Sequence, residues 1–263
     1  MEMGLKGKVA IVTGGSDGIG KAAAESLARE GASVVICARR PDVLEEAASD
    51  IAASTGGAVL PVQADVTRTQ DIENVVNRAV ERFGRVDILV NNAGASAAAS
   101  FEAVDDKAWQ ADMDLKFYAA IRFSRLVIPH MKRVGGGRII NVTNLGGKAP
   151  RASSVPTSVS RAAGIALTKA LSKDLAAYHI LVNTVCIGLI ESGQHRRRWE
   201  RAKAQDPSLT LEAWYERLGK GVPVGRVGKA QEAGDVICFL ASERASFLSG
   251  TSVNIDGGSS AVI

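Results

Sequence analysis

The amino-acid sequence predicts an α/β fold in which a doubly wound, seven-stranded parallel sheet carries helices on both faces. Short β-branched runs alternate with longer stretches of helical periodicity along almost the whole chain, which is typical of βαβ units with right-handed crossovers. Gly is plentiful, at 27 residues, and aromatic residues make up only 5%, which suits helices packed closely on a parallel sheet. A length of 263 residues matches one large domain, so we expect residues 1–263 to form a single domain.

Seven strands and six helices account for most of the chain. The expected strands are residues 9–13, 33–37, 58–63, 86–90, 138–143, 180–186 and 251–255. The expected helices are residues 18–30, 41–54, 68–83, 105–133, 156–178 and 230–241.

One charged segment, residues 191–228, interrupts this alternation between the last two strands. It contains Trp199, Trp214 and Tyr215. Because insertions at the carboxyl ends of strands lie over the ligand crevice of an open α/β sheet, we expect a substrate lid here. A plain subunit contact is the alternative.

The charge balance argues against a nucleic-acid partner, since the net charge is only +4 and such proteins concentrate basic residues beside stacking aromatics. One basic run stands out, at Arg196, Arg197, Arg198, Arg201 and Lys203. It is interpreted as a solvated helix face, with a contact to an anionic substrate or to a neighbouring subunit as the alternatives.

The three cysteines, Cys37, Cys186 and Cys238, lie far apart without metal-ligand spacing, so we expect buried inert thiols and no metal site. The sequence shows neither a leader pattern nor an apolar run of membrane-spanning length. We therefore expect a cytoplasmic, reduced protein with no membrane partner.

A glycine-rich stretch directly after the first strand opens into a helix. Glycines are needed where the backbone turns tightly and lets a pyrophosphate approach a helix N-terminus, whose amides and dipole favour the anion. The residues expected to hold the phosphates are Gly14, Ser16, Asp17, Gly18, Ile19 and Gly20.

The glycine spacing resembles that of the short-chain dehydrogenase/reductase family, and further stretches join the resemblance in order. These are Asp65-Val66, Asn91-Asn92-Ala93-Gly94, Ile187-Gly188 through Ser192, and Val253 through Gly258. Because the matches span nearly the entire chain, the sequence is identified as a member of that family, similar to its single-domain 3-oxoacyl-ACP-reductase-like branch.

The resemblance implies a Rossmann-type fold that binds a nicotinamide dinucleotide. The further cofactor contacts that it implies are Asp65, Val66, Asn91, Ala93, Gly94, Arg161, Gly188, Ile190 and Ser192. It also implies a homodimer or homotetramer, paired through the long helices 105–133 and 156–178, and a small-molecule substrate. The family's usual Pro in the loop after the sixth strand is Ile187 here.

The end of the second strand favours NADP(H) over NAD(H). An acidic residue there would hold a ribose 2′-hydroxyl, but that position is Ala38, followed by Arg39 and Arg40. Guanidinium groups suit phosphate oxygens. If both arginines are solvated, NAD(H) remains the alternative, and Asp17 stands where many NADP-preferring relatives have a basic residue.

The family's proton-transfer residues are all replaced. Its members use a Tyr, a Lys four residues on, an upstream Ser, and an Asn on the preceding long helix. The resemblance places these positions, in that order, at Thr157, Arg161, Asn144 and Asp114. No Tyr-x-x-x-Lys pattern occurs anywhere in the sequence, so a shifted alignment does not restore them.

These replacements change the chemistry. A Tyr phenol, with an ordinary pKa of about 10, can be tuned toward neutrality by a cation, whereas a Thr hydroxyl cannot. Arg161 could hold ribose hydroxyls but cannot shuttle protons, and Asn144 could donate a hydrogen bond to a substrate oxygen. Asp114 could act as acid or base if burial raises its pKa, or could pair with Arg161.

Two basic residues outside this frame were also considered for proton transfer. Lys148 follows Asn144 by four residues and could reach the substrate, so it is kept as a candidate beside Asp114. His130, behind Pro129, is expected at the surface or at an interface, and Tyr118 is expected between subunits.

Three functional hypotheses follow. The first is an NADP(H)-dependent oxidoreductase acting on a carbonyl or alcohol, with an anionic substrate as one option. The second is a catalytically silent dinucleotide-binding partner or sensor. The third is a non-redox lyase, isomerase or hydratase that uses Asp114. Fold alone does not choose among them.

Overall fold

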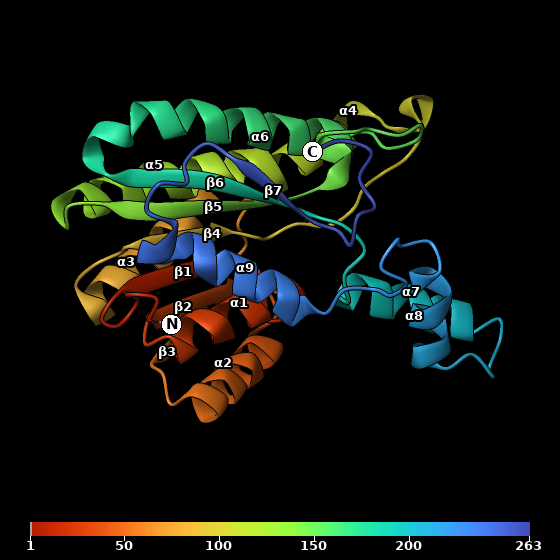
Figure 1. Cartoon of the computed structure of the whole chain (residues 1–263), viewed down its shortest axis with the longest axis horizontal. Helices are drawn as coiled ribbons and strands as arrows, with labels where there is room; N and C mark the ends of the chain where they lie inside the picture. Colours follow the sequence, from red (N-terminus) through yellow and green to blue (C-terminus); the bar gives the residue numbers. More distant parts are fainter. Residues whose placement is uncertain (1) are drawn as a thin grey trace.

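The computed structural model describes residues 2–263 and shows the predicted doubly wound sheet (Figure 1). Its seven strands are parallel and run in the order β3-β2-β1-β4-β5-β6-β7. The strands are β1 (Val9–Thr13), β2 (Ser33–Ala38), β3 (Val59–Gln63), β4 (Ile88–Asn91), β5 (Gly137–Asn144), β6 (Ile180–Ile187) and β7 (Ser252–Ile255). The order reverses between β1 and β4, and ligands of such sheets bind at the carboxyl end of this switch point.

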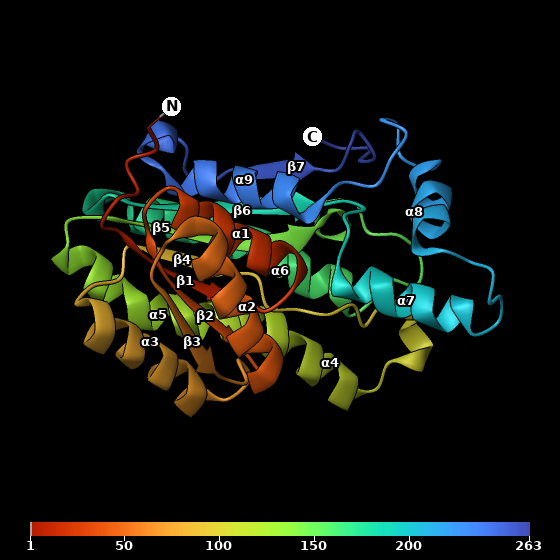
Figure 2. The ribbon, with the colours of Figure 1, turned by 90° about the horizontal axis from the view of Figure 1, so that it is seen from below.

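Helices cover both faces of the sheet (Figures 1 and 2). One face packs against α1 (Gly18–Arg29), α2 (Pro41–Thr55) and α9 (Ala230–Ala241). The other face packs against α3 (Thr69–Phe83), α5 (Ala119–Arg133) and α6 (Thr157–Asp174).

Strand side chains alternate between two apolar cores, one on each face of the sheet. In β1, Ala10 and Val12 join the core beneath α1, α2 and α9, whereas Ile11 joins the core beneath α3 and α5. Because both faces are covered, β1 buries all of its residues, which explains its nearly unbroken apolar sequence.

The long helix expected over residues 105–133 is interrupted. α4 (Asp106–Met113) and α5 are joined by a π-helical turn, Asp114–Tyr118. Such turns are rare and frequently lie at functional sites. The helix expected over 156–178 also ends early, at Asp174, and is followed by the 3₁₀ turn Ala176–Tyr178.

The inserted segment forms α7 (Gly193–Lys203) and α8 (Leu211–Gly219), which project beyond the carboxyl ends of the strands, at the right of Figure 1. The Trp199 indole donates to the carbonyl of Leu209 at 3.0 Å, which ties α7 to the loop that precedes α8. All five basic residues of the run on α7 are exposed in this chain.

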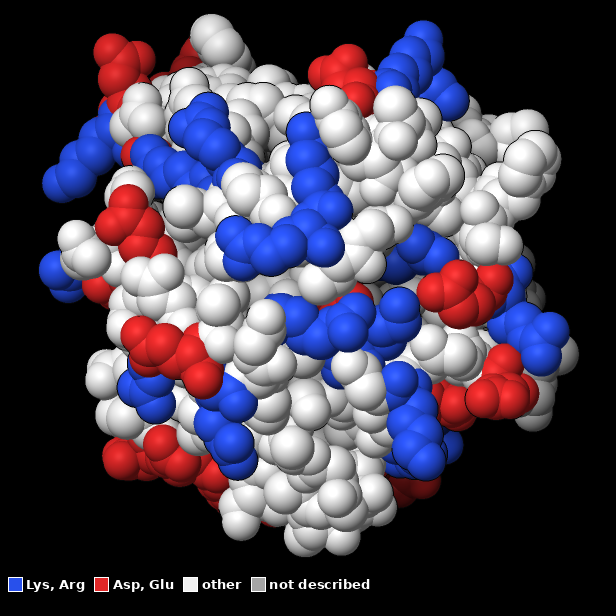
Figure 3. Space-filling model, turned by 90° about the vertical axis from the view of Figure 1, so that its left-hand side faces the viewer, with Lys and Arg blue, Asp and Glu red and all other residues white. Residues whose placement is uncertain are grey.

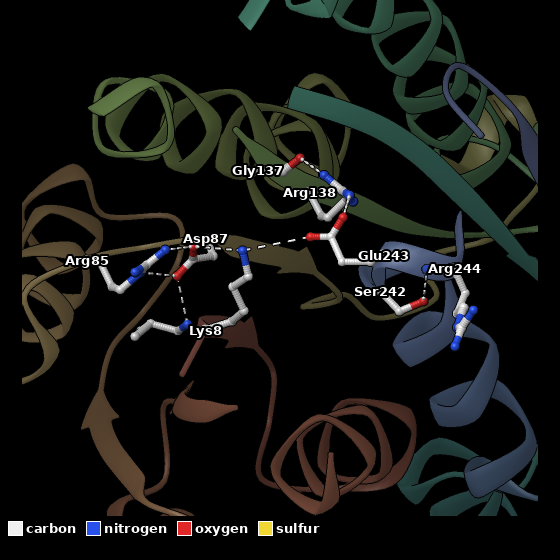
Figure 4. A network of polar contacts seen from close by, with 9 residues as sticks. Lys8, Arg85, Asp87, Gly137, Arg138, Ser242, Glu243 and Arg244 are labelled. Carbon is white, nitrogen blue, oxygen red and sulfur yellow. Dashed lines mark hydrogen bonds and ion pairs between the residues drawn. The ribbon is translucent and has the colours of Figure 1, made fainter. Parts of the chain in front are cut away.

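The opposite end of the sheet carries a network of ion pairs (Figure 4). The buried Asp87 carboxylate accepts from the backbone nitrogen of Val9 at 2.9 Å and from two nitrogens of Arg85 at 2.8 and 2.6 Å. Glu243 lies 3.8 Å from Lys8 and 3.3 Å from Arg138. Figure 3 views this end, where Lys and Arg gather near the middle of the face with acidic side chains among them. The network joins the starts of β1, β4 and β5.

The three cysteines are buried and unpaired, and burial raises the thiol pKa of Cys37 and Cys238 to about 12. Within residues 2–263, no three or more His, Cys, Asp and Glu side chains gather as a metal site would require. In the same part of the chain, every helix is too short or too polar to span a bilayer.

Candidate active site

The glycine-rich loop after β1 has a shape that only glycines allow. Gly14 and Gly18 have φ of +65° and +53°, in the left-handed region. A Cβ on Gly15 would lie 2.7 Å from the Ile36 side chain, and one on Gly20 would overlap the carbonyl of Gly14. The backbone at the N-terminus of α1 therefore stays open to a close-lying anion.

Asn92 and Thr13 hold this loop against the turn after β4. The Asn92 amide donates to the carbonyls of Thr13 and Gly14 at 2.9 and 3.2 Å. In return, the Thr13 hydroxyl accepts from the backbone nitrogens of Asn92 and Ala93 at 2.9 and 3.0 Å. Asn91 turns instead toward β5 and donates to Asn141 at 2.9 Å. The buttressing role of Asn92 is not among the expected contacts.

Asp17 caps α1, and its carboxylate accepts from the backbone nitrogen of Gly18 at 2.7 Å. The same carboxylate contacts Gly193, the first residue of α7, where a Cβ would overlap it. Asp17 therefore joins the glycine-rich loop to α7, which accounts for an acidic residue at this position.

Arg39, Arg40 and Asp65 follow the carboxyl ends of β2 and β3. Both arginines are exposed, and the Arg39 carbonyl accepts from Gln63 at 3.1 Å. Partial burial would raise the pKa of the Asp65 carboxyl, but hydrogen bonds from Thr67 and the charge of Arg39 outweigh it, so the pKa is lowered. Val66 beside it is buried in the core.

The remaining expected cofactor residues lie on the glycine-rich loop, on the turn after β4 and on the segment after β6. The nitrogen of Gly188 donates to the carbonyl of Ile255 at 2.9 Å, Ile190 is buried, and Ser192 caps α7. Ile19 packs on the core, and Ser16 is half-buried. A Cβ on Gly94 would lie 2.7 Å from Nη2 of Arg161, so this glycine makes room for the guanidinium.

Thr157, Arg161 and Asn144 meet at the carboxyl end of β5. Thr157 begins α6, and its hydroxyl accepts from the backbone nitrogen of Ala97 at 2.9 Å. Arg161 donates to the carbonyl of Val142 at 2.6 Å, and burial lowers its pKa to about 10, so it stays charged at neutral pH. The amide oxygen of Asn144 is buried without a partner among residues 2–263.

Two residues that the sequence patterns do not single out complete this centre. Lys116 donates from Nζ to the Thr157 hydroxyl at 3.0 Å and forms an ion pair with Asp112. Both side chains are only 1% exposed. Burial and the charge of Arg161 lower the pKa of Lys116 to about 8, against the raising effect of Asp112. Their i,i+4 spacing is the one signal that could find them.

The expected alternative in which Asp114 pairs with Arg161 is wrong. Its carboxylate pairs with Arg122 at 3.2 Å and accepts from Gln110 at 2.9 Å, and it makes no ion pair with Arg161. Residues two apart on a helix point about 200° apart, whereas residues four apart share a face. Asp112 and Lys116 therefore face the centre, and Asp114 faces away from it.

Lys148 is also directed elsewhere. Its ammonium group donates to the Ser252 carbonyl at 2.8 Å and to the Asn254 amide oxygen at 2.7 Å. It therefore fastens the loop after β5 to β7 instead of facing Thr157. His130 lies in the last turn of α5, where partial burial and Arg133 lower its pKa, and Tyr118 is 39% exposed.

With this geometry in place, comparison with known proteins decides the family. The family model described as short chain dehydrogenase matches residues 8–203. The chain belongs to the short-chain dehydrogenase family. It is accordingly an oxidoreductase of that family, whose cofactor is a nicotinamide dinucleotide.

Several relatives cover nearly the whole chain. A 3-oxoacyl-[acyl-carrier-protein] reductase of Thermotoga maritima is 33% identical over 97% of this chain and 99% of its own length. Dehydrogenase/reductase SDR family member 4 of Bos taurus is 34% identical over 97% of this chain and 88% of its own.

Two solved structures are informative. The L-sorbose reductase of Gluconobacter frateurii, complexed with NADPH and L-sorbose, has a TM-score of 0.95 and 33% identity, with all of both chains covered. A short chain oxidoreductase of Pseudomonas aeruginosa PAO1, described as containing an atypical catalytic center, has a TM-score of 0.92 and 34% identity over 99% of this chain and 100% of its own.

Proposed function

We propose that this short-chain dehydrogenase is an NADP(H)-dependent oxidoreductase that interconverts a carbonyl and an alcohol at an altered proton-transfer centre. The observation that carries the proposal is the 3.0 Å contact between Lys116 Nζ and the Thr157 hydroxyl, because it places a titratable acid at a centre that has no catalytic Tyr. The NADPH complex of the L-sorbose reductase supports the choice of cofactor.

The residues present fit a dinucleotide phosphate. The open cradle of Gly14, Gly18 and Gly20 would hold the pyrophosphate, and Arg39 and Arg40 would hold the 2′-phosphate. Asp65 and Val66 would border the adenine. Arg161, Asn91, Ala93, Gly94, Gly188, Ile190 and Ser192 would line the nicotinamide ribose and its ring. When bound, the cofactor supplies or accepts the hydride.

Proton transfer falls to Lys116 and Thr157. In reduction, the substrate oxygen takes the hydroxyl proton of Thr157 while Thr157 receives one from the Lys116 ammonium, so the Thr oxygen conducts a proton without ionising. A Lys with a pKa near 8 matches neutral operation far better than a free Lys. In alcohol oxidation the same protons move in reverse, toward a neutral amine.

Asn144 and Arg161 complete the proposed centre. The amide oxygen of Asn144 only accepts hydrogen bonds, so its amide N–H would be the group that donates to the substrate oxygen as negative charge develops on it. Two cations, Lys116 and Arg161, stand against one carboxylate, Asp112, so one positive charge is in excess. That excess would stabilise an alkoxide and would favour an anionic substrate.

The lid and the assembly belong to the same proposal. Residues 191–228 would cover a small-molecule substrate, and Gln194 already accepts from the Ser96 backbone nitrogen at 3.2 Å, beside the loop that bonds Thr157. We propose a single domain over residues 1–263 that acts in the cytoplasm as a homodimer or homotetramer.

The alternatives differ in support. A silent dinucleotide-binding subunit is favoured by one observation, the near-complete burial of Lys116 in its pair with Asp112. A non-redox enzyme built on Asp114 loses its basis, because Asp114 faces Arg122.

Fluorescence titration with NADPH and NADH tests the cofactor, and NADPH is expected to bind at least about tenfold more tightly. NADPH oxidation is then followed over a panel of ketoses, 3-oxoacyl thioesters and 2-oxo acids. Turnover of at least one compound supports the proposal. Tight NADPH binding without oxidation by any member would favour the silent subunit, and equal affinities would overturn the role of Arg39 and Arg40.

A further inference from the structure

Asp112 is a buried carboxylate at the junction of α4 and α6. Its Oδ1 pairs with Lys116 and lies 3.4 Å from the Thr157 hydroxyl. Its Oδ2 accepts from the Ser160 hydroxyl at 2.6 Å. Ser160 also reaches the carbonyl of Thr157, at 3.1 Å. Both oxygens are thus occupied, as a buried charge requires.

The arrangement does more than hold α4 to α6. Without an anion between them, the Lys116 ammonium and the buried Arg161 guanidinium would repel each other. Asp112 pairs with Lys116, and its charge also raises the pKa of Arg161 against the lowering effect of burial.

The direction of the ammonium depends on this carboxylate as well. Lys116 has three donors, of which one meets Asp112 and one meets Thr157. The two acceptors are also linked to each other. The Thr157 hydroxyl lies 3.4 Å from Asp112 Oδ1, and the Ser160 hydroxyl contacts both Asp112 Oδ2 and the carbonyl of Thr157. The Lys116 nitrogen is therefore held in a triangle with the carboxylate oxygen and the hydroxyl that would pass on its proton.

We propose that Asp112, fixed by Ser160, is a positioning residue that aims the Lys116 ammonium at Thr157 and keeps it charged beside Arg161. This inference rests on the proposed function, since it assigns the control of proton supply at the same centre. Because a carboxylate favours the neighbouring ammonium, its loss should let Lys116 deprotonate at lower pH.

The test compares Asp112→Asn with Asp114→Asn. Both variants remove one carboxylate from the same segment, but Asp114 faces Arg122, so its variant is a matched control. Protein labelled with ¹³C-lysine reports the titration of the Lys116 ε-carbon, whose resonance is identified by its absence in Lys116→Met. This readout needs neither substrate nor cofactor.

In Asp112→Asn the Lys116 midpoint is expected to fall by about one pH unit or more, whereas in Asp114→Asn it should stay at the wild-type value. For a carbonyl substrate that the enzyme reduces, the pH at which kcat declines on the alkaline side of its pH profile should fall by the same amount. The affinity for NADPH should not change. Asp112→Glu, which keeps the charge, should restore at least half of the shift.

A folded Asp112→Asn protein with a wild-type Lys116 midpoint overturns the proposal. If Asp112→Asn does not fold, Ser160→Ala replaces it, and kcat should fall several-fold as the carboxylate loses its anchor on α6. If Ser160→Ala changes neither kcat nor the Lys116 midpoint, the proposal is overturned. If wild-type protein reduces no carbonyl, the proposed function fails, while the titration still decides what Asp112 does to Lys116.

Discussion

The ammonium nitrogen of Lys116 lies 3.0 Å from the hydroxyl oxygen of Thr157. This contact joins the π turn after α4 to the first residue of α6, two elements that meet at the carboxyl end of β5. The centre has no phenol, but it contains an amine with a lowered pKa that donates a hydrogen bond to a hydroxyl. Under the proposed function, this contact gives Lys116 and Thr157 a shared role in proton transfer.

Replacing Lys116 should remove the proton source. Lys116→Met is expected to lower kcat by about a hundredfold, because general acid catalysis contributes on that scale, and to leave NADPH affinity unchanged. Lys116→Arg keeps the charge but has a pKa too high for proton transfer, so it should be nearly as slow. Steady-state kinetics and fluorescence titration measure both. An active Lys116→Arg variant would show that charge alone suffices.

The two reaction directions should depend oppositely on pH. Burial and Arg161 lower the pKa of Lys116 to about 8, so the ammonium is present below that value and lost above it. Carbonyl reduction, which needs the ammonium, should decline as pH rises through about 8. Alcohol oxidation, which needs the amine, should increase there. Parallel kcat profiles for the two directions would contradict this assignment.

Arg39 should discriminate between the two cofactors. Arg39→Ala is expected to weaken NADPH binding by about tenfold, the loss of one charge-assisted phosphate contact, while NADH binding changes little. Arg82→Ala, an exposed arginine on the outer side of α3, is the control and should change neither. Equal weakening of both cofactors by Arg39→Ala would assign this residue to the adenine and not to the 2′-phosphate.

Asp87 should matter for stability and not for chemistry. Its side chain is 5% exposed and accepts from Arg85 and from the backbone nitrogen of Val9, so Asp87→Ala leaves the buried Val9 nitrogen unpaired and removes the partner of Arg85. We expect a loss of about 2 kcal/mol in the free energy of unfolding, measured in urea. Glu243→Ala, whose carboxylate is 56% exposed, should cost under about 1 kcal/mol. Similar losses for both would show that burial of Asp87 is unimportant.

Most of the fold follows from local patterns in the sequence. The β-branched runs predict all seven strands, and β1 occupies the expected residues. The glycine spacing predicts the phosphate cradle because a turn with φ of +65° at Gly14, and no room for a side chain at Gly20, is a local requirement.

The proton-transfer centre depends instead on which face of a helix meets which strand. Asp112, Asp114 and Lys116 lie within five residues, yet the π turn and the packing on α6 send only Asp112 and Lys116 toward Thr157. The position of Lys148 is likewise set by β7, more than a hundred residues later. The sequence by itself determined the sheet, the dinucleotide loop and the loss of the catalytic Tyr. Only the tertiary structure decided which charged side chain contacts Thr157, because facing directions arise from contacts between segments distant in the chain.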